Sequence, residues 1–241
     1  MPKNKSLTDR GTVPPAMSSD GDIAAFVSEA RRKAPPPTGE RGRLIFALDA
    51  TMSRQPTWDR ACQLQAEMFR ETTSIGGLDV KLVYFRGFNE CRASGWVDNP
   101  AKLTDLMTRI DCRGGHTQIR KVLAQTRKDA QRDRVSALVY VGDAMEEGID
   151  DLCAIAGELG ILKVPAFLFQ EGHDPIAERA FREIARLTGG AWCRFDPNAP
   201  GQLRELLSAV AVYAAGGRRA LEHRGRSSTE SRLLLEQLSG K

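Results

Sequence analysis

The sequence predicts an α/β fold in which helices cover both faces of a mostly parallel central sheet. Short apolar runs alternate along the chain with amphipathic segments of helical length, which is the pattern of strand–helix–strand units. The apolar runs are continuous, as expected of strands that are buried on both faces. With 241 residues, 41% of them hydrophobic, the chain is long enough for one sizeable domain with a real core.

The expected strands are short and rich in branched or aromatic side chains. The first, Leu44 to Leu48, contains no polar residue. The segment around Phe88 to Trp96 is more polar and predicts a hairpin or an edge strand. The other expected strands cover residues 80–85, 135–141, 164–169 and 191–195.

Between these strands, apolar residues recur three and four positions apart, which indicates helices with one buried face. The expected helices lie around residues 58–72, 103–110, 119–126, 152–159, 176–187 and 203–214. The fifth of them stops at Gly189 and Gly190, a common signal for the C-terminal end of a helix. Together these elements predict a doubly wound, Rossmann-like sheet.

The two ends of the chain differ from the centre in composition. We expect residues 1–40 to be an N-terminal tail with a short amphipathic helix at 20–32 and a stiff linker at Pro35–Pro37. That helix could pack back on the domain or dock a partner. The domain is predicted to span residues 41–217. A basic tail, 218–241, follows and is expected to be solvated apart from a short helix around Leu233–Leu238.

Composition limits the classes of function. The formal net charge of +4 is too small to predict nucleic-acid binding by itself. No apolar run approaches the roughly 20 residues that cross a bilayer, and no signal peptide is evident. Five scattered cysteines without a Cys-x-x-Cys pair favour reduced thiols over disulfides or zinc. We therefore expect a cytoplasmic protein.

Polar residues follow two expected strands and precede one expected helix. Asp49, Thr51 and Ser53 come directly after the first strand, and Asp143 follows the strand at 135–141. Between them, Gly114-Gly115-His116-Thr117 opens the helix at 119–126. Because ligands of such sheets bind at the carboxyl ends of the strands, we expect these side chains to meet. Hydroxyl and carboxylate oxygens are hard ligands that suit Mg²⁺ or Mn²⁺.

Asp49-x-Thr51-x-Ser53, the later Gly-Gly-x-Thr ending at Thr117, and Asp143 resemble the metal-ion-dependent adhesion site of von Willebrand factor type A (VWA) domains. The resemblance spans roughly residues 43–215. It implies that Ser53 and either Thr51 or Thr117 bind the metal directly, while Asp49 and Asp143 act directly or through water.

The resemblance also implies a function. It suggests a bacterial cytosolic binding module without catalytic activity, in which Mg²⁺ coordinates an Asp or Glu of a partner protein. An ATPase or a modifying enzyme is a common partner of such proteins. No membrane partner is expected.

The sequence departs from the family pattern at several positions. Thr51 stands where Ser is usual, and Met52 and Ala144 stand where Gly is usual. None of these changes removes a ligand. Met52 and the neighbouring Arg54 are expected to make the rim of the site bulkier and more cationic.

Plainer readings of the same residues stay open. Asp49, Thr51 and Thr117 could be helix caps, although Pro56 and Thr57 are better placed to start the following helix. His116 and Arg113 could contact an acidic ligand or be solvated. Other single residues have simple structural explanations: Glu146 and Glu147 as first-turn acids of the next helix, Cys112 as an inert thiol, and Trp58, Trp96 and Trp192 as packing residues.

Two other functions compete with the binding module. The first is a Mg²⁺-dependent phosphoryl-transfer hydrolase with Asp49 as nucleophile, but such enzymes normally need a second acid where this chain has Thr51. No Ser-His-Asp set, phosphate-binding loop or dinucleotide fingerprint is found. The second is nucleic-acid binding by the arginines of the C-terminal tail, which lack interleaved aromatic residues: Arg218, Arg219, Arg224 and Arg226.

Overall fold

A computed structural model describes residues 41–196 and 200–238 of the chain. The helix expected at 20–32 and the linker at Pro35–Pro37 lie outside the described residues. The fold is built on one six-stranded sheet with the order β3-β2-β1-β4-β5-β6. The strands are β1 (Gly42–Asp49), β2 (Leu78–Arg86), β3 (Glu90–Val97), β4 (Ala137–Gly142), β5 (Ala166–Glu171) and β6 (Ala191–Phe195).

All neighbouring strands run parallel except β2 and β3, which form an antiparallel hairpin. This confirms the edge strand predicted around Phe88 to Trp96. β3 is only partly buried along its length, whereas β1 and β4 are buried almost throughout. Their continuous apolar sequences therefore reflect helices on both faces of the sheet.

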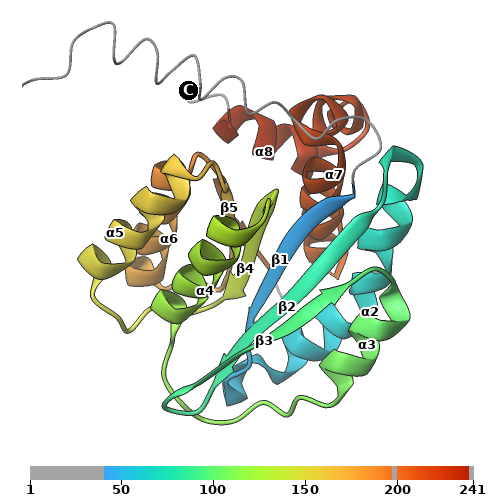
Figure 1. The fold of residues 1–241 in the computed structure, drawn as a ribbon. Helices are drawn as coiled ribbons and strands as arrows, with labels where there is room; N and C mark the ends of the chain where they lie inside the picture. The colour runs from blue at the N-terminus through green and yellow to red at the C-terminus, as the bar shows by residue number, and fades with distance from the viewer. Residues whose placement is uncertain (1–40, 197–199, 239–241) are drawn as a thin grey trace, which may run out of the picture. The chain divides into compact units, whose positions relative to one another are not determined.

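The helices form two layers (Figure 1). Helices α4 (Ile119–Arg132), α5 (Ile149–Ile161) and α6 (Pro175–Thr188) cover one face, and α2 (Gln55–Thr72), α3 (Pro100–Thr108) and α7 (Pro200–Gly225) cover the other. Two short 3₁₀ turns, η1 (Met52–Arg54) and η2 (Thr73–Ile75), flank α2. The described part of the chain thus has the predicted doubly wound α/β architecture.

The C-terminal segment differs from the solvated tail that we expected. Gly217 breaks the helical geometry inside α7, with φ 68°, but the chain then resumes a helix to Gly225 and forms α8 (Thr229–Leu238). Leu221 and Leu234 of this segment are fully buried in the same core as α2 and α7. The burial of these leucines keeps the segment packed back on the domain.

Arginines of this segment are also engaged. Arg224 bonds to Glu71 of α2 and to Glu205, and Arg218 pairs with Glu222. Two of the four arginines on which the nucleic-acid hypothesis depends are therefore paired with carboxylates.

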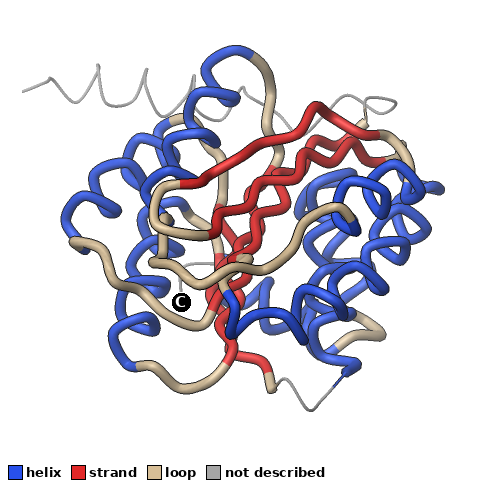
Figure 2. Tube along the Cα trace, turned by 90° about the horizontal axis from the view of Figure 1, so that it is seen from below, coloured by secondary structure: helices blue, strands red, loops and turns tan. Residues whose placement is uncertain are grey.

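The topology defines one natural place for a ligand. β1 lies between β2 and β4 in the sheet. Along the chain, β2 and β3 are added on one side of β1 and the strands from β4 onward on the other, so the direction of winding reverses between β1 and β4. The loops after β1 and β4 lead to α2 and α5 on opposite faces of the sheet, and in folds of this kind the ligand crevice lies between two such loops. Figure 2 looks onto this end of the sheet, where the long loop between α3 and α4 crosses the strands.

Candidate metal centre

The loop after β1 is held by its own first residue. Asp49 is 3% exposed, and its Oδ1 accepts a hydrogen bond of 2.7 Å from the backbone N–H of Thr51. Pro56 lies in the first turn of α2, and neither Thr51 nor Arg54 caps the helix that follows it through its side chain. The hydroxyls of the loop are therefore not used as helix caps, and the capping alternative for Asp49 and Thr51 is wrong.

The polar side chains of this loop and of β4 form a continuous chain of contacts. Thr51 Oγ1 lies 3.4 Å from Ser53 Oγ, and Ser53 Oγ donates to Asp143 Oδ2 over 3.4 Å. Three oxygen-bearing residues from two separate loops thus meet, above a buried fourth, Asp49. Distances of 3.4 Å are long for hydroxyl hydrogen bonds, so these oxygens are near one another without satisfying one another.

Thr117 is linked to this group through the β4–α5 loop: its backbone N–H and its hydroxyl bond to Glu146, and no hydrogen bond within the described residues joins it to Asp49, Thr51, Ser53 or Asp143. Its N–H donates to Glu146 Oε2 over 2.9 Å, and its Oγ1 accepts the N–H of Glu146 over 3.0 Å. Glu146 belongs to the loop that Asp143 begins. The hydroxyl oxygen has a second lone pair that this bond leaves for a metal ion. Helix α4 begins after Gln118, so Thr117 is not its N-cap.

Two acids of the β4–α5 loop were expected in the first turn of α5 but contact the segment that leads into α4 and the first residues of α4. Glu146 and Glu147 precede α5 and do not lie in its first turn. Glu147 instead accepts the backbone N–H groups of Ile119 (2.5 Å) and Arg120 (3.0 Å), at the start of α4. These carboxylates satisfy N–H groups that α4 leaves free at its N-terminus, and so lock the Thr117 loop to the Asp143 loop.

The long loop 109–118 is fixed against the ends of two strands. Arg113 N–H donates to the carbonyl of Ala50, and His116 N–H donates to the carbonyl of Gly87 in the β2–β3 turn. A Cβ atom on Gly115 would overlap that same Gly87 carbonyl. Only glycine allows this approach, which explains the second glycine of the Gly-Gly-x-Thr sequence.

Arg54 was expected on the rim of the site, but it lies inside the site. The residue is 2% exposed, and its guanidinium reaches Glu171 at the end of β5 (2.5 Å) and Asp143 Oδ2 (3.5 Å). Thr57 Oγ1 also donates to Glu171. Met52, by contrast, does lie on the rim, with 62% of its surface exposed. Glu171 was not singled out from the sequence, although it lies two residues after the strand predicted at 164–169, at the carboxyl end where ligands of such sheets bind.

The electrostatics of the site follow from burial. Burial raises the pKa of Asp49 to about 6, against the hydrogen bonds from Thr51 and with a smaller contribution from the charge of Asp143. Burial acts to lower the pKa of Arg54, but Glu171, Asp143 and Asp49 hold it above its ordinary value, so the guanidinium stays charged. The thiol of Cys112 has a pKa raised to about 11, mainly by burial, which fits an inert thiol.

The donor set fits a hard divalent cation. It consists of hydroxyls and two carboxylates, which suit Mg²⁺ or Mn²⁺ and leave room for water. In the described part of the chain, no group of three or more His, Cys, Asp or Glu side chains could hold a metal. A site here would therefore depend on the hydroxyls of Thr51, Ser53 and Thr117, and their role as ligands stays a prediction.

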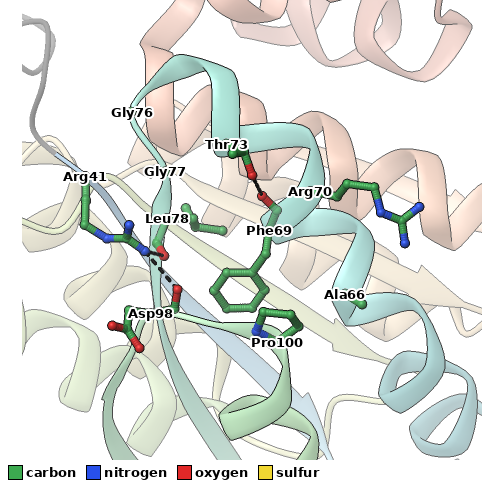
Figure 3. A pocket seen from close by; sticks show the side chains of 10 residues that line it. All are labelled: Arg41, Ala66, Phe69, Arg70, Thr73, Gly76, Gly77, Leu78, Asp98 and Pro100. Carbon is green, nitrogen blue, oxygen red and sulfur yellow. Dashed lines mark hydrogen bonds between the residues drawn. The ribbon is translucent and has the colours of Figure 1, made fainter.

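A depression of about 420 Å³ lies at the amino-terminal end of the strands beside Leu78 (Figure 3). Its arginines are already bonded: Arg41 binds Asp79 and the carbonyls of Leu78 and Asp98, and Arg70 binds Glu67. In Figure 3 the guanidinium of Arg70 points away from Arg41. This depression has no set of polar side chains comparable to the set at the carboxyl ends of β1 and β4.

Comparison with known structures places the fold in a class. A six-stranded sheet with one antiparallel edge and helices on both faces is the architecture of VWA domains. No protein-family model and no curated protein sequence matches the chain. Solved structures do match.

Three solved structures illustrate the likeness. A von Willebrand factor type A protein from Catenulispora acidiphila superposes with a TM-score of 0.58 at 17% identity, over 71% of this chain and 43% of that one. The VWA domain of SpRpn10 gives 0.54 at 13% identity, over 73% and 97%. Proximal thread matrix protein 1 from the mussel byssus, with a zinc-occupied MIDAS motif, gives 0.59 at 13%, over 72% and 46%.

These matches establish that the chain has the VWA fold. At such low identity they show the fold alone. The matched region is less than half of the Catenulispora protein and of the mussel protein, so their other parts have no counterpart in it. None of the helices in the described ranges is long and apolar enough to cross a membrane.

Proposed function

We propose that this protein is a metal-dependent protein-interaction module without catalytic activity of its own. Its ion would be Mg²⁺ or Mn²⁺, held by Asp49, Thr51, Ser53, Thr117 and Asp143. Once bound, the ion would offer an electrophilic position to an Asp or Glu side chain of a partner. The observation that carries this proposal is the meeting of Ser53 Oγ and Asp143 Oδ2 at the crevice between β1 and β4.

The exposure of the ligands supports a site that is open on one side. Asp49 is 3% exposed, whereas Ser53, four residues later in the same loop, is exposed. Side chains that hold the loops, such as Glu146 and Glu147, use their oxygens on backbone N–H groups. They hold the loop residues in place, and of the three candidate hydroxyl residues Ser53 is the exposed one.

The surroundings of the opening suit a protein partner. Met52 is 62% exposed and Phe88, in the β2–β3 turn, is 77% exposed. Phe88 packs edge-on against His116, with ring centroids 5.2 Å apart. Exposed apolar side chains beside a polar site are typical of protein-binding surfaces. One neighbour in fold, the mussel protein, carries zinc in its MIDAS motif, which supports divalent-metal binding by this arrangement.

A hydrolase that uses Asp49 as nucleophile has less support. The carboxylate is 3% exposed and one of its oxygens is committed to Thr51 N–H. Thr51 occupies the position where such enzymes place their second acid. A screen for metal-dependent phosphatase activity would revive this function if it found efficient turnover of a phosphomonoester.

The proposed function is tested by affinity capture from a lysate of the source cells, with Mg²⁺ and then with EDTA. We expect proteins that remain bound in Mg²⁺, elute with chelator and are not captured by the Ser53→Ala variant. Ser74→Ala, at an exposed serine of η2, is the matched control and should capture like the wild type. Capture that is indifferent to EDTA and to Ser53→Ala would contradict the proposal. Partners of cytoplasmic origin would agree with the expected location.

A further inference from the structure

Arg54 places a permanent positive charge inside the candidate metal centre. The residue ends η1, directly after Ser53, and its side chain is turned inward. One guanidinium nitrogen, Nη2, lies 2.5 Å from Glu171 Oε2, and the other, Nη1, lies 3.5 Å from Asp143 Oδ2. Buried arginines are rare because taking the charge out of water is costly, so such a residue needs a specific reason.

The guanidinium is held in place from the far side. Glu171, at the end of β5, accepts both from Arg54 and from the hydroxyl of the buried Thr57 in α2. The Nε of Arg54 is buried and has no hydrogen-bond partner. The side chain is therefore not placed to satisfy all of its donors. Its position is set by the two carboxylates that it bridges.

Asp143 Oδ2 contacts both Ser53 and Arg54. It accepts from Ser53 Oγ, and it also lies 3.5 Å from Arg54 Nη1. A divalent cation bound by Ser53 and Asp143 would lie close to this guanidinium. Two positive charges close together repel most strongly where burial limits screening by water, and Arg54 is 2% exposed.

We propose that Arg54 is a built-in cation that competes with the divalent metal for Asp143 and thereby sets the affinity of the site. This inference rests on the proposed metal-dependent function. In the absence of metal, the guanidinium balances the charge of Asp143 and Glu171 and keeps the β1, β4 and β5 ends together. When metal binds, the same charge weakens its hold. The site is thus tuned to weak, readily reversed metal binding.

The test measures binding of Mn²⁺ alone, by calorimetry and by electron paramagnetic resonance of the free ion. Arg54→Gln removes the charge and keeps a donor for Glu171, and we expect it to tighten Mn²⁺ binding by about tenfold or more. Glu171→Gln leaves Arg54 uncompensated beside Asp143, and we expect it to weaken binding several-fold. The opposite signs distinguish a charge effect from a general loss of structure.

Arg224→Gln is the matched control. Arg224 is also a largely buried arginine that bridges two carboxylates, Glu71 and Glu205, and its Nε is likewise without a partner. It lies among α2 and α7, away from the β1–β4 crevice. We expect this variant to lower the melting temperature without changing Mn²⁺ affinity. If Arg54→Gln does not fold, Glu171→Gln decides, because tighter binding by that variant would overturn the proposal.

The outcomes separate this inference from the proposed function. Binding by the wild type and tighter binding by Arg54→Gln support both. Wild-type binding that Arg54→Gln leaves unchanged or weakens overturns only the inference. Binding by Arg54→Gln but not by the wild type supports the inference in its strongest form and contradicts the metal-dependent function. Absence of binding in both proteins overturns both.

Discussion

Asp49 and Ser53 are four residues apart in one loop but have opposite environments. Asp49 is buried and restrains the loop through Thr51 N–H, whereas Ser53 is exposed and its hydroxyl lies 3.4 Å from both Thr51 Oγ1 and Asp143 Oδ2. The first residue therefore shapes the loop and supplies charge from below. The second faces the opening through which a partner carboxylate would arrive.

Replacing Ser53 tests this division of roles. We expect Ser53→Ala to weaken Mn²⁺ binding by about 10- to 100-fold, because a hydroxyl ligand is lost, while stability changes by less than about 0.5 kcal/mol at an exposed position. Calorimetric titration and urea denaturation measure the two quantities. Ser74→Ala should change neither. Unaltered Mn²⁺ affinity in Ser53→Ala would exclude Ser53 as a ligand.

The cysteines give a prediction about pH. Burial raises the pKa of Cys91 and of Cys193 from 9.0 to about 11, because the charged thiolate is disfavoured inside the protein. A raised folded-state pKa means that the stability contributed by the neutral thiol is complete below pH 9 and is lost as the pH rises toward about 11. Urea denaturation midpoints measured between pH 8 and 11 for the wild type and for Cys193→Ala check this. The midpoint of the wild type should fall more over this range than that of Cys193→Ala.

Thiol accessibility provides the second half of that prediction. At pH 8, folded protein should react with iodoacetamide at least about tenfold more slowly than urea-unfolded protein, since the thiolate is the nucleophile. Fast alkylation of Cys193 in the folded state, mapped by peptide mass spectrometry, would show that the thiol is not shielded.

The positions of single side chains could be predicted only in part from the sequence. Asp49, Ser53 and Asp143 could be predicted to meet, because each follows or flanks a strand and parallel strands bring their ends together. Arg54 could not be placed, since an arginine after a polar loop is normally exposed. The capping of α4 by Glu147 depends on a contact between loops that are 28 residues apart.

Among the elements, the loop 109–118 has no regular structure yet determines where Thr117 lies. It is held by Ala50 and Gly87 through backbone hydrogen bonds and by Gln118, whose side chain donates to the carbonyls of Arg86 and Gly87. These bonds connect the β1 loop, the β2–β3 turn and α4. The positions of the candidate ligands are therefore coupled.

The two adjacent glycines of this loop offer a matched pair of substitutions. We expect Gly115→Ala to destabilise the protein by about 1–3 kcal/mol and to weaken Mn²⁺ binding, because the added methyl group would overlap the Gly87 carbonyl. Gly114→Ala should be close to neutral, since nothing lies within 4 Å of its Cβ position. Equal effects of the two changes, in urea denaturation and Mn²⁺ titration, would contradict this account of the loop.

Most elements could be predicted from hydrophobic spacing alone. The two-sided burial of β1 and β4, the polar edge strand β3 and the stop of α6 at Gly189 all have local causes, and Gly189 indeed adopts φ 67°. The end of the domain could not be predicted in the same way. Gly217 does interrupt the helix, but whether the chain then leaves or folds back depends on packing against α2 and β6.

At the scale of the whole molecule, α7 and α8 close one face of the sheet. Leu207, Val210 and Leu221 of α7 are buried in the same core as Leu44 and Phe46 of β1. Gln237 of α8 bonds to both backbone groups of Trp192 in β6. The C-terminal segment is thus part of the core's packing and not an independent appendage.

Adjacent leucines in α8 test this packing. Leu234 is fully buried and Leu233 is 46% exposed. We expect Leu234→Ala to cost about 2–5 kcal/mol of unfolding free energy and Leu233→Ala less than about 1 kcal/mol. Urea denaturation followed by circular dichroism measures both. Similar small losses in the two variants would indicate that α8 contributes little to the folded state.

The central claim is that oxygens from the loops after β1 and β4, joined by Thr117, surround one hard divalent ion. The most direct measurement is anomalous diffraction from crystals grown with Mn²⁺. We predict one strong peak about 2 Å from Ser53 Oγ, between Asp49 and Asp143, with Thr117 beside it. A well-ordered crevice without a peak, or a peak bound only by residues outside this set, would contradict the account.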